Sequence, residues 1–377
     1  MQYLAILGRQ PKISLAELES LFTEVSVVAG SNNLLATFES ETAPDISRLG
    51  GTIKLAEPLY ECEFKKSLAT FLVGYANKND FSSKFVIGVS DYSKGATARK
   101  TQGEALRLKR DLKKVGFNMR VLPNKEAVLS SAAVFHNQLG EKPGHFEFIK
   151  FNDCWFVGLG VQNIKAYAER DQARPARDAK NGMLPPKLAQ ILVNLCGPLE
   201  PGARILDPFC GTGVVLQEAL LMGYRAYGTD ISERIVGFAR KNLKWLNRGD
   251  FELSVGDAQD FKWKGPIDAV AFEGYLGPPM SQPPAEIKMK QVKEELTPLY
   301  HNVLRNLSNQ LQSGTPVVMA IPAWLRPDGH YSHLKILDVI DELGYNVVKY
   351  KDLSQKDLLY YRDGQVVARE IIVLRKK

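Results

Sequence analysis

The chain has 377 residues, 45% of them hydrophobic and 24% charged, which is the composition of an ordinary globular protein. One hydrophobic core rarely serves so long a chain, so we expect two or three domains. The first apolar run is only about five residues long and has no basic stretch before it, unlike a secretory signal. No other apolar run approaches the roughly 18 residues of a membrane span. We therefore expect a cytoplasmic protein with no membrane partner.

The cysteines and histidines show no arrangement typical of a metal site or a disulfide framework. The four cysteines are scattered and form no CxxC pair, and His330 and His333 are a weak pair at most. We therefore predict neither structural zinc nor any other metal.

The positive charge of the chain is concentrated in one stretch. The net charge is +7, and residues 84–125 hold 11 basic and three acidic residues, so the remainder is nearly neutral. This stretch is the first candidate for contact with an acidic partner such as nucleic acid.

Residues 1–78 predict a small α+β domain. A strand, YLAIL, is followed by SLAE at 14–17, a capping-box pattern that predicts the start of a short helix. Two further strands, VSVV and LLATF, flank the turn residues 30–33 and predict a hairpin.

A second domain is predicted over residues 79–170. The strand FVIGVS precedes a helix over 103–116 with Ala105, Leu108, Leu112 and Val115 on one face, and Gly116 ends it. The opposite face is basic, and a basic loop precedes it. This surface is either a solvated helix face or a nucleic-acid site. Its candidate residues are Lys94, Arg99, Lys100, Arg107, Lys109, Arg110, Lys113 and Lys114.

The remaining chain changes character. Two strands, FEFIKF and CWFVGLGV, close the second domain, and the arginine-rich residues 171–184 resemble a linker. A helix then begins on Pro185 and Pro186 and ends at Gly197. Strands and helices alternate from there, which predicts an α/β domain over 185–377 with a mostly parallel, doubly wound sheet.

The segment ILDPFCGTG at 205–213 joins a strand to a helix through a glycine-containing turn. Glycines are needed where a ligand lies against the main chain. Asp207 ends this strand, Asp230 ends the next, and Asp257 ends the third, beside Ala258. Three acidic strand ends suit a nucleoside with a cationic sulfonium: Asp207 toward the methionine amine, Asp230 toward ribose hydroxyls and Asp257 toward the adenine amine.

These residues resemble a known family. Residues 207–213 are similar to the first S-adenosylmethionine (SAM) motif of RNA methyltransferases that modify guanine N2. The segment GMLPPKL at 182–188 resembles the entry helix of the THUMP-domain tRNA guanine-N2 methyltransferases. EAVLSSA, FHNQL and YAERD within 85–171 resemble the THUMP module, which in that family binds the acceptor end of tRNA. The resemblance implies a Rossmann-like SAM-dependent domain with an antiparallel last strand, preceded by a THUMP-like domain. It implies cofactor contacts from Asp207, Phe209, Gly211, Thr212, Gly213, Asp230, Ile231, Asp257 and Ala258.

The fourth strand carries the candidate catalytic residues. Amino methyltransferases of this fold place an acidic or amide residue, two prolines and an aromatic there, because a conjugated amine is a poor nucleophile and needs an acceptor. Here the strand ends in FEGYLGPP, so Glu273 is the expected acceptor, Gly274 replaces a proline and Tyr275 stacks on the base. Alignment on Pro278 and Pro279 is the alternative and supplies no carboxylate.

Three further features of the C-terminal domain lead to predictions. Residues 277–298, with Lys288, Lys290 and Lys293, predict either a substrate-facing loop or a surface insertion. Arg326 and Arg362 lie near later strand ends, where they would meet phosphates or stay surface charges. No cysteine follows residue 210, so a covalent ring-carbon mechanism is disfavoured and Cys210 is expected to be buried in the turn.

The sequence thus predicts a SAM-dependent methyltransferase acting on an exocyclic amine in RNA, with guanine N2 in tRNA as the expected target, by direct in-line transfer. One alternative is a DNA adenine-N6 or cytosine-N4 methyltransferase. Another is a THUMP-type RNA-binding protein with impaired catalysis. The expected partner is tRNA or another structured RNA, and a small activator subunit is left open.

Overall fold

The computed structural model describes residues 1–32, 34–59, 64–81, 83–114, 116–178 and 183–377. The chain forms two compact units. Unit 1 comprises residues 1–11 and 22–165, and unit 2 comprises residues 12–21 and 166–377. Residues 12–21, which form all but the first residue of a helix, are therefore part of the C-terminal unit, although they follow the first strand of unit 1.

Unit 1 is built on a single eight-stranded sheet in the order β2-β3-β1-β4-β8-β7-β5-β6. Most neighbours are antiparallel, and β5 pairs in parallel with both β6 and β7. The strands are β1 (Gln2–Leu7), β2 (Thr23–Val27), β3 (Leu35–Glu39), β4 (Thr52–Pro58), β5 (Phe85–Asp91), β6 (Met119–Val121), β7 (His145–Phe151) and β8 (Cys154–Val161).

This sheet runs through both predicted N-terminal domains. Strands from residues 1–78 and from residues 79–170 meet where β4 pairs with β8. The predicted hairpin is present, since β2 and β3 are antiparallel neighbours. The division at residue 78 therefore falls inside one continuous sheet, with α2 (Phe64–Asn79) ending at that point.

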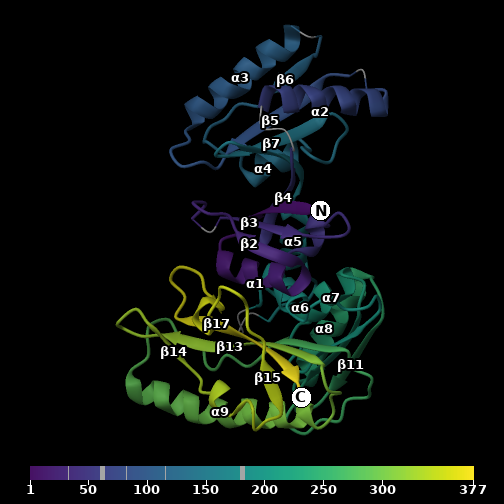
Figure 1. Cartoon of the computed structure of the whole chain (residues 1–377). Coiled ribbons are helices and arrows are strands. Elements are labelled where there is room, and N and C mark those ends of the chain that lie inside the picture. Colours follow the sequence, from purple (N-terminus) through teal and green to yellow (C-terminus); the bar gives the residue numbers. More distant parts are fainter. Residues whose placement is uncertain (33, 60–63, 82, 115, 179–182) are drawn as a thin grey trace. The chain divides into compact units, whose positions relative to one another are not determined.

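Two helices, α2 and α3 (Ala98–Lys114), cover the β5 and β7 part of the sheet, as Figure 1 shows. Ala105, Leu108 and Leu112 of α3 pack into one core with Phe85 and Phe148. The predicted apolar face of α3 is thus confirmed, except that Val115 lies outside the described residues. The smaller helix α4 (Ser131–His136) is capped by Ser130, whose Oγ accepts a hydrogen bond from the Ala133 amide.

The predicted capping box at Ser14 and Glu17 is wrong. Helix α1 (Pro11–Leu21) begins three residues earlier, and both side chains are buried within it. Proline suits the first turn of a helix, which explains the earlier start. Glu17 serves a different contact, because its Oε1 accepts a hydrogen bond of 2.7 Å from Asn194 Nδ2 of helix α6 (Pro186–Asn194).

Unit 2 confirms the predicted α/β architecture. Its sheet has the order β11-β10-β9-β12-β13-β17-β15, parallel from β11 to β13, with β17 antiparallel to β13 as its long last strand. The short strands β14 and β16 pair with β13 and β17. The strands are β9 (Arg204–Asp207), β10 (Arg225–Asp230), β11 (Phe251–Val255), β12 (Ala269–Glu273), β13 (Pro316–Leu325), β14 (Tyr331–His333), β15 (Tyr345–Val347), β16 (Leu359–Tyr360) and β17 (Val367–Lys376).

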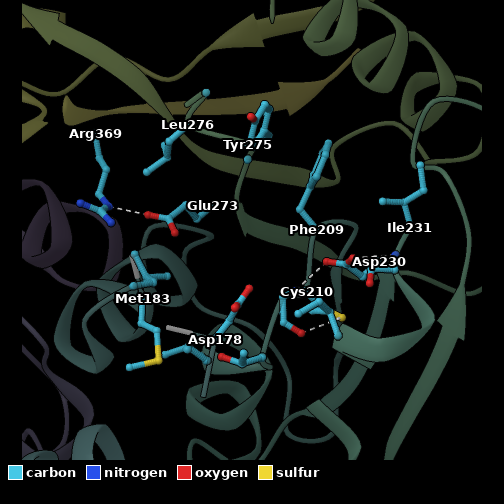
Figure 2. A pocket seen from close by; sticks show the side chains of 18 of the residues that line it. Asp178, Met183, Phe209, Cys210, Asp230, Ile231, Glu273, Tyr275, Leu276 and Arg369 are labelled. Atoms are coloured by element: carbon cyan, nitrogen blue, oxygen red, sulfur yellow. Dashed lines mark hydrogen bonds and ion pairs between the residues drawn. The ribbon is translucent and has the colours of Figure 1, made fainter. Parts of the chain in front are cut away.

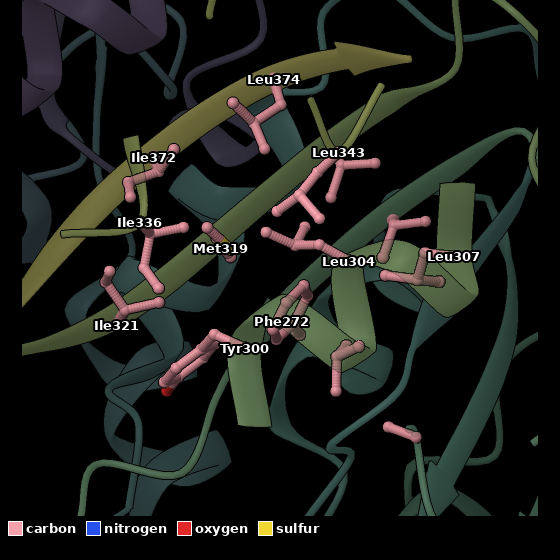
Figure 3. Packing of buried hydrophobic residues seen from close by; sticks show 14 of the residues in the cluster. Phe272, Tyr300, Leu304, Leu307, Met319, Ile321, Ile336, Leu343, Ile372 and Leu374 are labelled. Carbon is pink, nitrogen blue, oxygen red and sulfur yellow. The ribbon is translucent and has the colours of Figure 1, made fainter. Parts of the chain in front are cut away.

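Helices cover both faces of this sheet. One core joins Ala271 and Val318 of the sheet to Ile13 of α1, Leu188 of α6 and Val215 of α7 (Val214–Leu221). Helix α8 (Glu233–Leu246) packs beside α7 over β10. The opposite core, shown in Figure 3, packs α9 (Glu286–Ser308) against β12, β13 and β17. Labelled members include Phe272, Tyr300, Leu304, Leu307, Met319, Ile321, Ile372 and Leu374.

The predicted loop over residues 277–298 is mostly helix. Helix α9 begins at Glu286 and runs through Pro298, and only residues 274–285 connect it to β12. Its buried residues recur with helical spacing, at Met289, Val292, Leu296 and Tyr300. They pack on one face of the sheet. Tertiary packing of this apolar stripe outweighs the local cost of the proline.

Candidate functional site

A cavity of about 810 Å³ opens at the carboxyl ends of the parallel strands of unit 2. Open parallel sheets bind ligands at this edge because the loops there leave a crevice. The strand-end carboxylates Asp207, Asp230 and Asp257 all line it, as does Glu273 at the end of β12. The structure therefore brings together the acidic residues that the sequence analysis selected one by one.

The first turn is shaped by glycines and by Asp207. Gly213 has φ 87° at the N-cap of α7, and Gly211 has φ 51°, both in the left-handed region that favours glycine. Asp207 is 2% exposed, and its Oδ1 accepts a hydrogen bond of 3.0 Å from the Phe209 amide. The Asp207 carboxylate thus stabilises the turn through this hydrogen bond and also lines the cavity.

Asp230 ties the second strand to the same turn. Its Oδ2 accepts from the Gly211 amide at 3.1 Å, and its Oδ1 accepts from the Ser232 amide at 2.9 Å. Ile231 beside it is 71% exposed and lines the cavity. Its side chain therefore adds apolar surface to the wall of the cavity.

The other predicted cofactor residues fall into two groups. Phe209, Thr212, Asp257 and Ala258 line the cavity. Asp257 also accepts a hydrogen bond of 2.9 Å from the Gln259 amide. Gly213 does not line the cavity, and its place is structural: a Cβ there would contact Ala239 of α8 at 3.4 Å.

Burial perturbs the acidic groups of the cavity. It raises the pKa of Asp207 well above its ordinary value, and the neighbouring carboxylates of Asp230 and Glu273 add to this rise. Burial also raises the pKa of Asp230, partly offset by its two backbone hydrogen bonds. Carboxylates held away from water favour a cationic ligand that would neutralise them.

Glu273 is held by a partner that the sequence analysis missed. Figure 2 shows Arg369 of β17 beside Glu273, and Arg369 Nε donates a hydrogen bond to Glu273 Oε1 in a buried ion pair. Burial raises the pKa of Glu273, whereas the Arg369 guanidinium lowers it. A cue exists in the sequence, where Arg369 and Glu370 interrupt the apolar run of a strand.

The turn after β12 explains why glycine stands at position 274. The Gly274 amide donates to the Ala320 carbonyl at 3.0 Å, which a proline could not do. A Cβ at Gly274 would also meet Tyr300 Oη and lie 2.5 Å from its Cε1. Glu273 closes β12, and Pro278 and Pro279 lie beyond it in the loop.

Tyr275 and Phe209 line the cavity between the two ends that Figure 2 shows, with Glu273 on one side and Asp230 and Ile231 on the other. Tyr275 is 46% exposed, and Phe209 stacks on Phe272 with ring centroids 5.6 Å apart. Further lining residues that were not predicted are Asp178, Met183, Arg234, Gln365 and Val367.

Cys210 is buried as expected, and burial raises its thiol pKa well above the ordinary value, so a thiolate is disfavoured.

Among the described residues, no three His, Cys, Asp or Glu side chains are grouped so as to hold a metal. No helix in that same part of the chain is long and apolar enough to span a membrane. Arg362 is exposed and hydrogen-bonded to Tyr360.

The predicted RNA-binding residues all belong to unit 1. Lys94, Arg99, Lys100, Arg107, Arg110, Lys113 and Lys114 are exposed, and Lys109 is half-buried. They lie on α3 and the loop before it, and the buried face of α3 points to the sheet. The basic surface predicted from the sequence is therefore present.

Comparison with known proteins agrees with this geometry. Residues 174–327 match the family UPF0020, described as an RMKL-like methyltransferase domain. The tRNA (guanine(10)-N2)-dimethyltransferase of Methanothermobacter thermautotrophicus is 38% identical over 157 residues, 41% of this chain and 44% of the relative. That of Pyrococcus abyssi is 32% identical over 195 residues, 51% and 53% of the two chains. The matches span about half the length of these curated relatives.

A solved structure, TrmN from Thermus thermophilus, aligns over 100% of both chains with 17% identity and a TM-score of 0.48. The family match confirms a methyltransferase domain in unit 2, and the predicted methyl donor, SAM, is confirmed with it. The resemblance to tRNA guanine-N2 methyltransferases is confirmed by the curated relatives.

Proposed function

We propose that this chain transfers a methyl group from SAM to the exocyclic N2 of guanine in tRNA. The observation that carries the proposal is the position of Glu273, which lies in the wall of the same cavity as Asp207, Asp230 and Asp257. The proposed cofactor-binding residues and the proposed acceptor carboxylate therefore line the same cavity. The names of the curated relatives support guanine N2 as the target and tRNA as the substrate.

The acidic strand ends fit the cofactor. Five carboxylates line the cavity against two arginines, a balance that suits a ligand with a sulfonium and an ammonium group. Asp207 would hold the ammonium, Asp230 the ribose hydroxyls and Asp257 the adenine amine, with Ile231 covering the ring. When bound, SAM supplies a methyl group on a cationic sulfur that leaves as a neutral thioether.

Glu273 would receive the guanine amine. One of its oxygens is occupied by Arg369, and the second would accept an N–H of the exocyclic group. Glu273 would accept the proton that the amine loses when its nitrogen takes the methyl group that SAM would supply. Tyr275 would stack on the flipped base and align the amine with the methyl group, so most of the acceleration comes from positioning.

The basic surface of unit 1 would bind the RNA. Its exposed lysines and arginines on α3 can contact backbone phosphates without reading a sequence. This supports structured RNA rather than a small molecule as the substrate.

The ion pair with Arg369 also favours a second candidate, an RNA-binding protein that retains SAM but has lost transfer. A carboxylate already satisfied by a cation is a weaker acceptor for an amine than a free one. The two candidates differ in whether label reaches RNA.

The test is incubation of the full-length protein with labelled SAM and unmodified tRNA transcripts, followed by nucleoside mass spectrometry. We expect label in N2-methylated guanosine, with a double-stranded DNA of similar length unlabelled. Label in adenine or cytosine would contradict the assigned amine. Bound SAM and bound tRNA without any transfer, across a set of tRNAs, would establish the second candidate instead.

A further inference from the structure

A second cavity of unit 2 lies outside the methyl-transfer site. It has a volume of about 990 Å³ and lies between the first part of α9 and the segment that follows β13. Lys293 enters it from α9, Arg326 from the end of β13 and Lys335 from the residues after β14. We call this cavity, defined by these three cations, the cationic cleft.

The cationic cleft holds more positive charge than its own acidic residues neutralise. Arg326 pairs with Asp328 at 3.2 Å, and the exposed helix pair Lys290 and Glu294 is 3.8 Å apart. Glu286 is the remaining carboxylate of its lining. Within the described residues, neither Lys293 nor Lys335 has a carboxylate within ion-pair distance.

Lys293 is the most confined of these cations. It is half-buried, and its Nζ donates a hydrogen bond of 2.8 Å to Ser332 Oγ. Burial lowers the pKa of Lys293, and the nearby cations Lys335 and Arg326 lower it further. Like charges gathered at one place repel each other, so an anion bound among them would relieve both effects.

The walls of the cationic cleft are mostly apolar. Pro284, Met289, Pro298 and Pro327 line it beside the cations. A bare inorganic anion would gain nothing from such surfaces, whereas the sugar and base of a nucleotide would cover them while the phosphate meets the lysines.

The cleft is also close to the methyl-transfer cavity. Residues 277–281 of the connecting loop line the transfer cavity, and Pro284 and Ala285 of the same loop line the cleft. Ser281 and Pro284 are three residues apart, so the chain separates them by at most about 11 Å. On α9, Pro298 lines the cleft and the next residue, Leu299, lines the transfer cavity.

Building on the proposed function, we propose that the cationic cleft binds the sugar-phosphate backbone of the RNA beside the nucleotide that is methylated. The flipped nucleotide enters the transfer cavity, and a neighbouring nucleotide places its phosphate between Lys293 and Lys335. The cleft thereby fixes the register of the RNA strand relative to Glu273.

The test compares full-length Lys293→Gln/Lys335→Gln with the wild type. The matched control is Lys241→Gln/Lys244→Gln, which removes two exposed lysines of α8 that line neither cavity. Equilibrium binding of unmodified tRNA is measured at several salt concentrations, together with SAM affinity and the single-turnover transfer rate. We expect the cleft variant to bind tRNA about tenfold more weakly, and its slope of log affinity against log salt to fall by about 1.5.

SAM affinity should stay within twofold of the wild type, the transfer rate should fall because the RNA strand is no longer held in register, and the control variant should resemble the wild type throughout. If the cleft variant keeps the wild-type tRNA affinity and salt slope, the inference is overturned. The same result is expected if the cleft binds an acidic protein partner instead of RNA. Equal losses in the control variant would overturn it as well, because the effect would then be one of net charge. Wild-type protein that binds tRNA without transferring methyl contradicts the proposed function alone, since the binding comparison still decides the role of the cleft.

Discussion

Tyr300 Oη donates a hydrogen bond of 2.9 Å to the main-chain carbonyl of Tyr275. Tyr300 is fully buried on α9, and Tyr275 lines the transfer cavity just after β12. The long helix thus holds the turn that presents the candidate stacking residue. Gly274 between Glu273 and Tyr275 is the residue that lets the Tyr300 ring approach the turn.

We expect Gly274→Ala to displace this turn, because the added Cβ collides with the Tyr300 ring. Overpacking of this kind costs about 1–3 kcal/mol, and misplacement of Tyr275 should slow transfer more than it weakens SAM binding. Thermal unfolding and single-turnover transfer measure the two effects. Gly237→Ala on α8, where a Cβ meets open space, is the control: it should leave the transfer rate unchanged and raise stability by about 0.5–1 kcal/mol, because alanine favours the helix over glycine.

Glu273→Ala should lower the transfer rate by about 100-fold or more while SAM affinity changes little, because this carboxylate is assigned to the amine and not to the cofactor. Titration calorimetry with SAM and single-turnover assays separate the two quantities. Loss of SAM affinity as the main effect would show that Glu273 belongs to the cofactor site.

Arg369→Gln should move the acid limb of the transfer rate to higher pH. Burial raises the pKa of Glu273 and Arg369 opposes this, so removal of the cation lets the pKa rise further. Transfer requires the ionised carboxylate and is therefore lost on acidification at a higher pH than in the wild type. Arg369→Lys keeps a cation and should restore most of the wild-type profile. A uniform loss of rate with an unmoved limb would mean that Arg369 has only a structural role.

SAM affinity should fall as the pH is lowered toward the raised pKa of Asp207. The buried carboxyl binds a proton more readily than an ordinary aspartate, and only its ionised form attracts the ligand ammonium. Binding should therefore release a proton wherever Asp207 is partly protonated in the free protein, which calorimetry in buffers of different ionisation enthalpy detects. Asp207→Asn should bind SAM weakly and with a flatter pH dependence. A wild-type affinity that does not vary with pH would contradict this role.

Replacement of Lys109, Arg110 and Lys113 by glutamine should weaken tRNA binding and flatten its salt dependence by about two units of slope. These residues lie on α3 in unit 1, away from the cofactor residues in sequence. SAM binding to unit 2 should be unaffected. The same loss of tRNA affinity at every salt concentration, with an unchanged slope, would point to misfolding of α3 in place of lost phosphate contacts.

The sequence by itself determined which carboxylates would gather at the candidate cofactor site. Asp207 and Asp230 end parallel strands and Asp257 lies two residues beyond a third, and the ends of parallel strands meet at one edge of a sheet whatever the details of packing. Local pattern was sufficient there, as it was for the basic face of α3.

Only the tertiary structure decided what surrounds Glu273, the proposed acceptor. Arg369 follows Glu273 by 96 residues and lies near the start of β17. Because β17 is antiparallel to β13, its beginning lies at the edge where the parallel strands end, and no local pattern specifies that pairing. The requirement for glycine at position 274 likewise depends on contact with Tyr300 of α9. The sequence did not predict α9, because this helix contains Pro298. Long-range packing fixes these contacts, so the sequence alone selects Glu273 and leaves its partners unassigned.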